Sequence, residues 1–127
     1  MEACRIEGLI DYISEKYKNA AEIGIGHFPN VAYSLLRRGV KVFATDIKPF
    51  RYNGLEVIVD NIIDPDFIIY NNVKIIYSIR PPVELVPYMR RLAKELLADL
   101  IVKSLASEYL DGQLIRNGNT TFYLWEL

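Results

Sequence analysis

Cysteine and histidine are almost absent from this chain of 127 residues, which has one of each, Cys4 and His27. A single cysteine excludes an intramolecular disulfide and a multi-cysteine metal centre. One histidine leaves too few ligands for a typical zinc site. We therefore expect no metal site, and we interpret Cys4 as a packing residue.

An excess of one charge and long apolar runs are missing as well. Fifteen basic residues nearly balance sixteen acidic ones, so no general attraction to nucleic acid or to an anionic membrane is expected. No apolar run approaches the roughly 18 residues of a membrane span, and the first residues lack the layout of a signal peptide. What is present, 51% hydrophobic residues, is typical of a single cytoplasmic domain over residues 1–127.

Short runs of β-branched and aromatic residues recur along the chain. They predict five strands, at residues 21–26, 40–46, 56–60, 73–79 and 99–103, of which 56–60 and 73–79 are expected to be buried parallel strands. Apolar residues at helical spacing predict helices over 6–17, from Pro29 to about Gly39, and over 84–96. Near the end, 113–116 and 120–126 flank Asn117-Gly118-Asn119, and Asn-Gly between apolar stretches predicts an antiparallel hairpin.

These elements together predict an α/β fold of three layers. The expected architecture is Rossmann-like, with a mostly parallel sheet closed by a C-terminal antiparallel hairpin. Residues 47–55 are too few for a crossover helix, and residues 104–112 are hardly more, so crossover helices should be missing. The sheet would be thinly covered there. Because exposed apolar surface often marks an interface, we expect a homodimer.

A short glycine-rich stretch follows the first predicted strand and precedes a predicted helix. Gly24 and Gly26 let the backbone turn sharply and let a ligand approach closely. Asp46 ends the next strand about 20 residues later, the spacing at which an acidic side chain meets ribose hydroxyls. Asp60 ends the third strand on the same carboxyl edge, where open α/β sheets bind ligands. The pattern predicts a nucleoside site, although such glycines also occur in turns that hold no ligand.

The residues around the glycines bear on whether the ligand contains phosphate. A dinucleotide site has a third glycine, whereas Phe28 and Pro29 stand at that place here. Pro29 also removes one N–H from the helix terminus that would bind a phosphate. Glu22 precedes the glycines and is placed to bind an ammonium directly or through water. S-adenosylmethionine has an ammonium and a ribose but no phosphate, so it fits these residues better than NAD.

The sequence resembles a known fold at two motifs and at its C-terminal end. Glu22-Ile23-Gly24-Ile25-Gly26, Val42-Phe43-Ala44-Thr45-Asp46 and the hairpin are similar to the class I S-adenosylmethionine-dependent methyltransferase fold. More closely, nearly the whole chain resembles a small, functionally uncharacterised archaeal family with such a Rossmann-like core. The stretches that carry this closer resemblance are residues 22–29, 44–47, 78–82 and 98–101.

The resemblance to the methyltransferase class implies a cofactor site. It would place Glu22 and Gly24 near the methionine end of S-adenosylmethionine, Asp46 at the ribose and Asp60 near the adenine. The class usually has a third glycine where Phe28 stands, so the sequence departs from the pattern at that position.

The acceptor end of the predicted site carries an arginine. Many class I methyltransferases that act on amines have Asp or Asn, then Pro-Pro and an aromatic residue, after the fourth strand, where this sequence has Arg80-Pro81-Pro82-Val83. A guanidinium repels a methyl sulfonium and accepts no proton, so amine methylation of that type is not expected. Arg80 suits an anionic group instead, or it forms an ion pair with Glu84 or Asp60.

Functions from different classes stay open. The leading hypothesis is methyl transfer from S-adenosylmethionine to a small or anionic acceptor, driven by positioning because no convincing general base is visible. His27 would contact the substrate as a base, or it would face solvent from the loop. The main alternative is a non-catalytic nucleoside-sensing or assembly module that kept the fold. An NAD-binding protein is disfavoured by Pro29 and by the lack of a substrate domain.

Overall fold

The computed structural model describes residues 6–105 and 108–127, and Cys4 lies outside them. A seven-stranded sheet with the strand order β3-β2-β1-β4-β5-β7-β6 forms its centre. The strands are β1 (Asn19–Ile23), β2 (Lys41–Asp46), β3 (Glu56–Val59), β4 (Ile75–Ile79), β5 (Asp99–Lys103), β6 (Gln113–Asn117) and β7 (Thr120–Trp125). The first five strands pair in parallel, and β7 runs antiparallel between β5 and β6. The predicted parallel strands and the C-terminal hairpin are confirmed, but the strand predicted at 56–60 is an edge strand with exposed ends and not a buried one.

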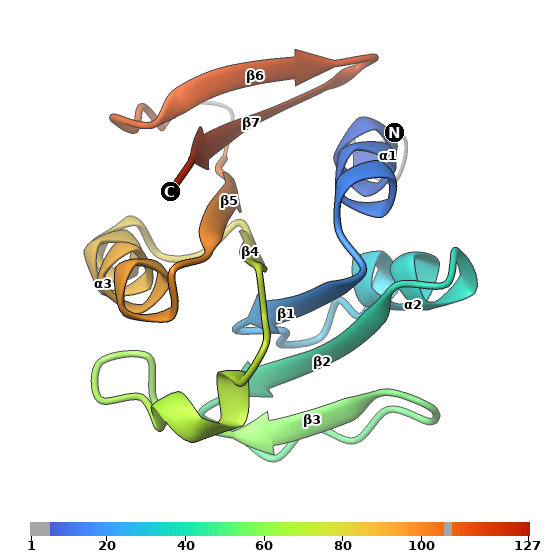
Figure 1. The fold of residues 1–127 in the computed structure, drawn as a ribbon, viewed down its shortest axis with the longest axis vertical. Coiled ribbons are helices and arrows are strands. Elements are labelled where there is room, and N and C mark those ends of the chain that lie inside the picture. Colours follow the sequence, from blue (N-terminus) through green and yellow to red (C-terminus); the bar gives the residue numbers. More distant parts are fainter. Residues whose placement is uncertain (1–5, 106–107) are drawn as a thin grey trace.

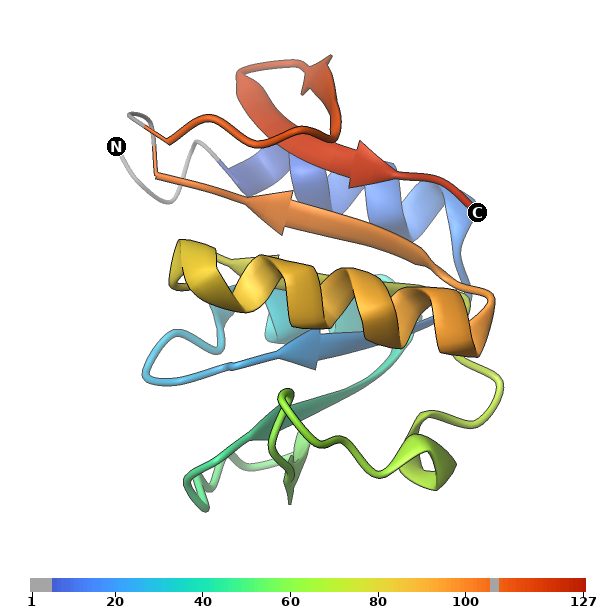
Figure 2. The same cartoon turned by 90° about the vertical axis from the view of Figure 1, so that its left-hand side faces the viewer.

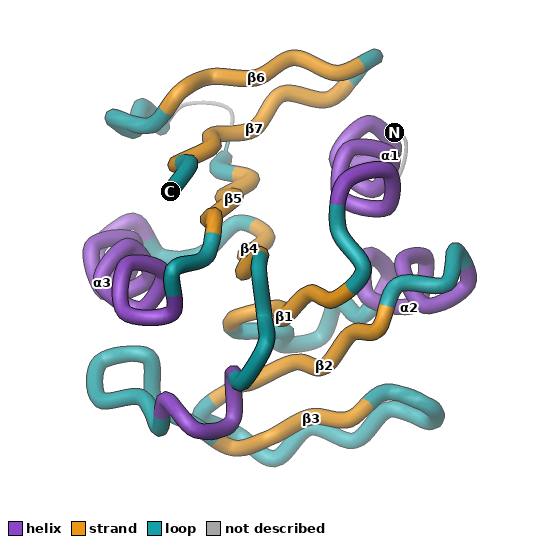
Figure 3. Tube along the Cα trace, in the orientation of Figure 1, coloured by secondary structure: helices purple, strands orange, loops and turns teal. Residues whose placement is uncertain are grey.

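Helices cover both faces of the sheet and produce the three predicted layers (Figures 1 and 3). The helices α1 (Glu7–Lys16) and α2 (Asn30–Arg37) lie on one face, and α3 (Val86–Leu96) lies on the other. Two short 3-10 turns, η2 (Phe67–Tyr70) and η3 (Val83–Leu85), precede β4 and α3 respectively. Figure 2 shows α3 from its exposed side, in front of the sheet and roughly along the direction of the neighbouring strands. None of the described helices is long and apolar enough to span a membrane.

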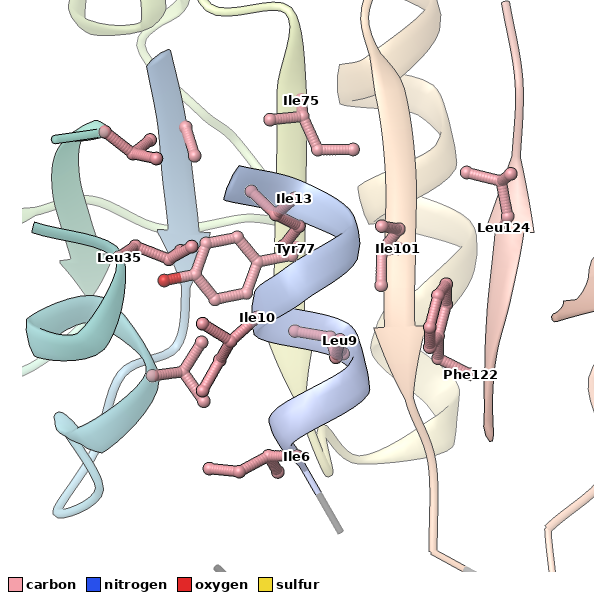
Figure 4. Packing of buried hydrophobic residues seen from close by; sticks show 13 residues of the cluster. Ile6, Leu9, Ile10, Ile13, Leu35, Ile75, Tyr77, Ile101, Phe122 and Leu124 are labelled. Carbon is pink, nitrogen blue, oxygen red and sulfur yellow. The ribbon is translucent and has the colours of Figure 1, made fainter. Parts of the chain in front are cut away.

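The first helix forms because its apolar residues recur three and four positions apart and thus share one face. Ile10 and Ile13 on this face are fully buried, and they pack with Tyr77 of β4 and Phe122 of β7 in one cluster. Figure 4 shows these side chains between α1 and the strands that it covers. Burial of this stripe therefore fixes the helix against the middle of the sheet and against the hairpin.

A glycine allows α1 to approach the C-terminal hairpin closely. The Gly8 N–H donates to Thr120 Oγ1 at 2.9 Å, and Asn117 Nδ2 donates to the Gly8 carbonyl at 2.8 Å. A Cβ on Gly8 would lie 1.9 Å from the Asn117 carbonyl oxygen, which is far inside van der Waals contact. The first helix and the last two strands are thus joined by backbone contact.

Two details of the sequence prediction need correction. The hairpin turn consists of Gly118 and Asn119, because Asn117 still pairs with Thr120, and the positive φ of +60° falls on Gly118. A positive φ at the first turn residue suits the twist of a two-residue hairpin. Pro29 is the cap that precedes α2 rather than its first helical residue.

The segments expected to lack crossover helices form none where the structure describes them. Residues 47–55 run in an irregular path instead, and Phe50 and Tyr52 from this segment pack on a small core cluster that contains Ala44 and Leu55. At the edge of the sheet, the side chain of Val59 stays 57% exposed. The predicted thin cover of this edge is therefore present, and the homodimer stays a prediction.

Candidate functional site

A cavity of about 250 Å³ opens at the carboxyl edge of the sheet, between the ends of β1, β2 and β4. Its floor and walls are mostly apolar, and its polar groups come from strand ends. The lining residues are Ile23, Gly24, Thr45, Asp46, Ile47, Asp60, Ile62, Ser78, Ile79, Arg80, Pro81, Pro82, Leu85 and Met89. Parallel strands bring their carboxyl ends to the same edge, so residues from four distant parts of the sequence meet here.

The glycine loop leaves β1 at the mouth of this cavity. Gly24 and Gly26 have φ values of +70° and +53°, in the region that L side chains rarely adopt. No atom lies within 4 Å of the position that a Cβ would take at either glycine. These glycines are therefore required by the backbone conformation and not by crowding.

The backbone N–H groups at the start of this loop already have acceptors inside the protein. Those of Gly24 and Ile25 both donate to the Thr45 carbonyl, at 2.9 and 3.2 Å. That of Gly26 donates to Asp46 Oδ2 at 2.9 Å. A phosphate-binding loop aims such N–H groups at its ligand. Here three of them point into β2, so the loop does not provide the usual cradle for a phosphate.

The two predicted aspartates lie side by side and are held in place. Asp46 Oδ1 accepts the Lys48 N–H at 3.1 Å, in addition to the Gly26 bond on Oδ2, and the Asp60 N–H donates to the Asp46 carbonyl at 3.0 Å. Each carboxylate oxygen has two lone pairs, so each Asp46 oxygen keeps one for a further donor. The arrangement suits a ligand with a pair of adjacent hydroxyls.

Asp60 is oriented by a second set of contacts that sequence reasoning missed. Its Oδ1 accepts the Asp66 N–H at 3.1 Å, and the buried Tyr70 hydroxyl lies 3.4 Å from Oδ2 and 3.2 Å from Thr45 Oγ1. Burial, together with the nearby Asp60, raises the pKa of Tyr70, so this hydroxyl keeps its proton at neutral pH. The sequence signal was weak, because Tyr70 lies in a short turn with no motif around it.

Glu22 is a predicted site residue that the structure does not bring to the cavity. Its side chain is 1% exposed and lies beside Tyr77, its Cα partner on β4, within the sheet face that α1 and α2 cover. Burial raises the pKa of this carboxyl to about 8, which outweighs the opposing effect of the Tyr77 hydroxyl. Glu22 is consequently a protonated core residue at neutral pH.

Arg80 and His27 differ in their relation to the cavity. Arg80 lines it, with a left-handed φ of +50° and an N–H that donates to the Lys103 carbonyl at 2.6 Å. This conformation is costly for a residue with a side chain, and such backbone strain is often found at functional sites. His27 is exposed and makes an edge-to-face contact with Phe50 at 4.9 Å, outside the cavity lining. Within the described residues no group of three or more His, Cys, Asp or Glu side chains is arranged to hold a metal ion.

The model of one family, described as "Uncharacterised protein family (UPF0146)", matches residues 6–126. The chain belongs to the UPF0146 family. A UPF0146 protein from Archaeoglobus fulgidus is 37% identical over 118 residues, which is 91% of each chain. Residues 6–126, which the family model matches, include every residue that lines the cavity of this UPF0146 protein.

Two solved structures with a fold similar to that of this UPF0146 protein are described as methyltransferases. The putative methyltransferase SMU.1697c from Streptococcus mutans, solved in complex with S-adenosylhomocysteine (SAH), has a TM-score of 0.53 at 17% identity, and the match covers 94% of this chain and 93% of that one. The sugar N-methyltransferase KedS8 from Streptoalloteichus sp. has a TM-score of 0.58 at 12% identity, and the match covers 87% of this chain but 53% of that chain. The UPF0146 protein therefore has the Rossmann-like methyltransferase fold, and it spans about half the length of the larger neighbour.

Proposed function

We propose that this UPF0146 protein binds S-adenosylmethionine in the cavity at the carboxyl edge of its sheet. The observation that carries the proposal is that the N–H groups of the glycine loop already have hydrogen-bond acceptors within the protein. The loop's first N–H groups donate to Thr45 and Asp46, while Asp46 lines the cavity and each of its carboxylate oxygens keeps a lone pair for a further donor. A loop of this kind suits a nucleoside without phosphate, and S-adenosylmethionine is such a nucleoside.

The cavity residues fit the parts of this ligand in turn. Asp46 would accept hydrogen bonds from the ribose hydroxyls, and Asp60 with Ile62 would border the adenine. Ser78 and Arg80 lie at the end of β4 and line the part of the cavity that would take the methionine group and the acceptor. NAD would bring a pyrophosphate to a loop whose N–H groups already have acceptors, so we expect it to bind poorly.

Methyl transfer to a small or anionic acceptor is the reaction that we propose for this site. S-adenosylmethionine supplies an activated methyl group when it is bound. The chain itself would orient the acceptor and supply a positive charge. Arg80 is a permanent cation that attracts an anionic acceptor but accepts no proton. Rate enhancement would come from holding the acceptor in line with the methyl group.

A non-catalytic nucleoside sensor is the second candidate, and one observation favours it. The cavity is lined by two aspartates that are already hydrogen-bonded, by Ser78, whose hydroxyl donates to the Ile23 carbonyl at 2.7 Å, and by Arg80. None of these side chains is arranged as a general base toward an acceptor. Ligand binding without turnover on any anionic acceptor would favour this candidate.

Calorimetric titration with S-adenosylmethionine, SAH and NAD tests the proposal. We expect the two adenosyl ligands to bind and NAD not to bind. The isosteric variant Asp46→Asn should weaken binding about tenfold or more, because a hydrogen bond to a charged group is lost. Asp64→Asn is the matched control, since Asp64 lies exposed at the same edge but does not line the cavity. Failure of both adenosyl ligands to bind at millimolar concentration would overturn the proposed function.

A further inference from the structure

The irregular segment of residues 47–55 lies where a crossover helix is missing, yet its path is well defined. The Leu55 N–H donates to the Tyr52 carbonyl at 3.2 Å and the Phe50 N–H to the Lys48 carbonyl at 2.9 Å. Gly54 supplies the positive φ of +76° that the turn between Tyr52 and Leu55 requires. The segment is therefore a structured part of the fold and not a slack connection.

Aromatic side chains join this segment to both the glycine loop and α2. The rings of Phe50 and Tyr52 are nearly parallel, at 6.3 Å and 4°, and the edge-to-face partner of Phe50 is His27. On the other side, Tyr33 of α2 packs edge-to-face on Tyr52 at 6.5 Å, and its hydroxyl donates to the Asn53 carbonyl at 2.8 Å. Such aromatic pairs fix relative positions as well as burying surface.

One hydrogen bond connects the segment directly to the backbone of the predicted nucleoside site. The Tyr52 hydroxyl donates to the Gly26 carbonyl at 2.5 Å. The N–H of the same glycine donates to Asp46 Oδ2. Both polar backbone groups of Gly26 are thus held, one by the ribose-binding candidate Asp46 and the other by Tyr52.

Besides the turn that the Phe28 N–H closes on the Ile25 carbonyl at 3.3 Å, these two bonds are the contacts that hold the backbone of Gly26 among the described residues. Glycine has access to more backbone conformations than any other residue, and no atom lies within 4 Å of its missing Cβ position. A trans peptide points its C=O and the next N–H in opposite directions. Holding the Gly26 carbonyl therefore also fixes the direction of the His27 N–H. The Asp46 bond holds the peptide plane before Gly26 and the Tyr52 bond holds the plane after it, so together they hold the glycine in its left-handed conformation.

We propose that Tyr52 is a positioning residue of the nucleoside site, acting through Gly26 on the carboxylate of Asp46. The inference rests on the proposed function, because it assigns Tyr52 to the same ligand site. Tyr52 lines none of the cavity itself and would touch no ligand. Burial, with the nearby Tyr33, Asp46 and Glu22, raises the pKa of Tyr52, so the hydroxyl stays a donor throughout the neutral range.

The test compares two conservative variants within the same segment. Tyr52→Phe removes the hydroxyl that binds Gly26, and Tyr33→Phe removes the hydroxyl that binds Asn53, at the other side of the segment. Titration with SAH should give a dissociation constant about two- to tenfold weaker for Tyr52→Phe and unchanged for Tyr33→Phe. In labelled protein without ligand, the NMR resonances of the Gly26 carbonyl and of Asp46 should shift in Tyr52→Phe alone.

Each outcome separates this inference from the proposed function. Equal weakening of SAH binding by both variants would overturn it, because Tyr52 would then act only through the stability of the segment. Unchanged Gly26 and Asp46 resonances in Tyr52→Phe would overturn it as well. If the wild-type protein binds no adenosyl ligand, the proposed function fails, and the NMR comparison alone then decides whether Tyr52 positions Gly26 and Asp46.

Discussion

Replacing Glu22 by glutamine should change how the stability of this protein depends on pH. Glu22 is fully buried, and burial raises the pKa of its carboxyl from the ordinary 4.5 to about 8 in the folded chain. Between these two pH values the folded protein holds the proton and the unfolded chain has lost it. Folding then takes up a proton, so the free energy of unfolding falls as pH rises through this window.

The size of this effect follows from the two pKa values. Each pH unit within the window changes the free energy of unfolding by about 1.4 kcal/mol, so the whole window amounts to about 5 kcal/mol. Small domains have about 5 to 15 kcal/mol of stability in total, so the loss that this one carboxyl causes as pH rises is large in comparison. Glutamine has nearly the same volume and does not titrate. The stability of Glu22→Gln minus that of the wild type should therefore grow by about 4 kcal/mol between pH 5 and pH 8.

Urea denaturation at several pH values between 5 and 8 measures this difference. Only the slope against pH is diagnostic, because the buried amide has its own unmet hydrogen bonds and shifts the whole curve by a constant. Glu56→Gln is the control, since Glu56 lies exposed on β3 and its replacement should leave the curve parallel to that of the wild type. Parallel curves for Glu22→Gln and the wild type would refute the reasoning, because Glu22 would then titrate alike in the folded and unfolded chains.

Two further substitutions test the packing of α1. Gly8→Ala should destabilise the protein by about 3 kcal/mol or more in thermal denaturation, because the new Cβ would meet the backbone of Asn117 at 1.9 Å; a loss below about 1 kcal/mol would contradict this packing. Arg38→Gln removes the ion pairs to Glu7 and Asp11, which are exposed, so it should cost at most about 1 kcal/mol, and that cost should vanish in 1 M salt. A cost that persists at high salt would mean that Arg38 acts through packing instead.

The sequence allowed prediction of those site residues that directly follow the ends of parallel strands. Asp46 and Asp60 could be placed together because the direction of a strand determines which edge its last residue reaches. Glu22 could not be placed by the same argument, because successive side chains on a strand point to opposite faces. Its neighbour Ile23 lines the cavity, so Glu22 points into the core on the other face.

The role of Tyr52 was beyond sequence reasoning for a different reason. Its contact with Gly26 depends on the irregular path of residues 47–55, and irregular segments have no period from which side-chain directions follow. For the hairpin, too, the sequence predicted the element but not its exact register. Asn-Gly predicted a hairpin, but Asn117 still pairs with Thr120. The turn therefore consists of Gly118, where φ is positive, and Asn119.

The contact between α1 and the hairpin has a consequence for how the chain acquires its fold during synthesis. The Gly8 N–H meets Thr120, 112 residues later in the sequence, and Asn117 binds the Gly8 carbonyl across 109 residues. Of the described elements, the first helix along the chain thus needs the last two strands to complete its contacts. Contacts of such sequence separation slow folding, and until they form the apolar face of α1 is open to chaperones or to other nascent chains. Closure of the α1 face against the hairpin is therefore expected late in folding, after both segments have been made.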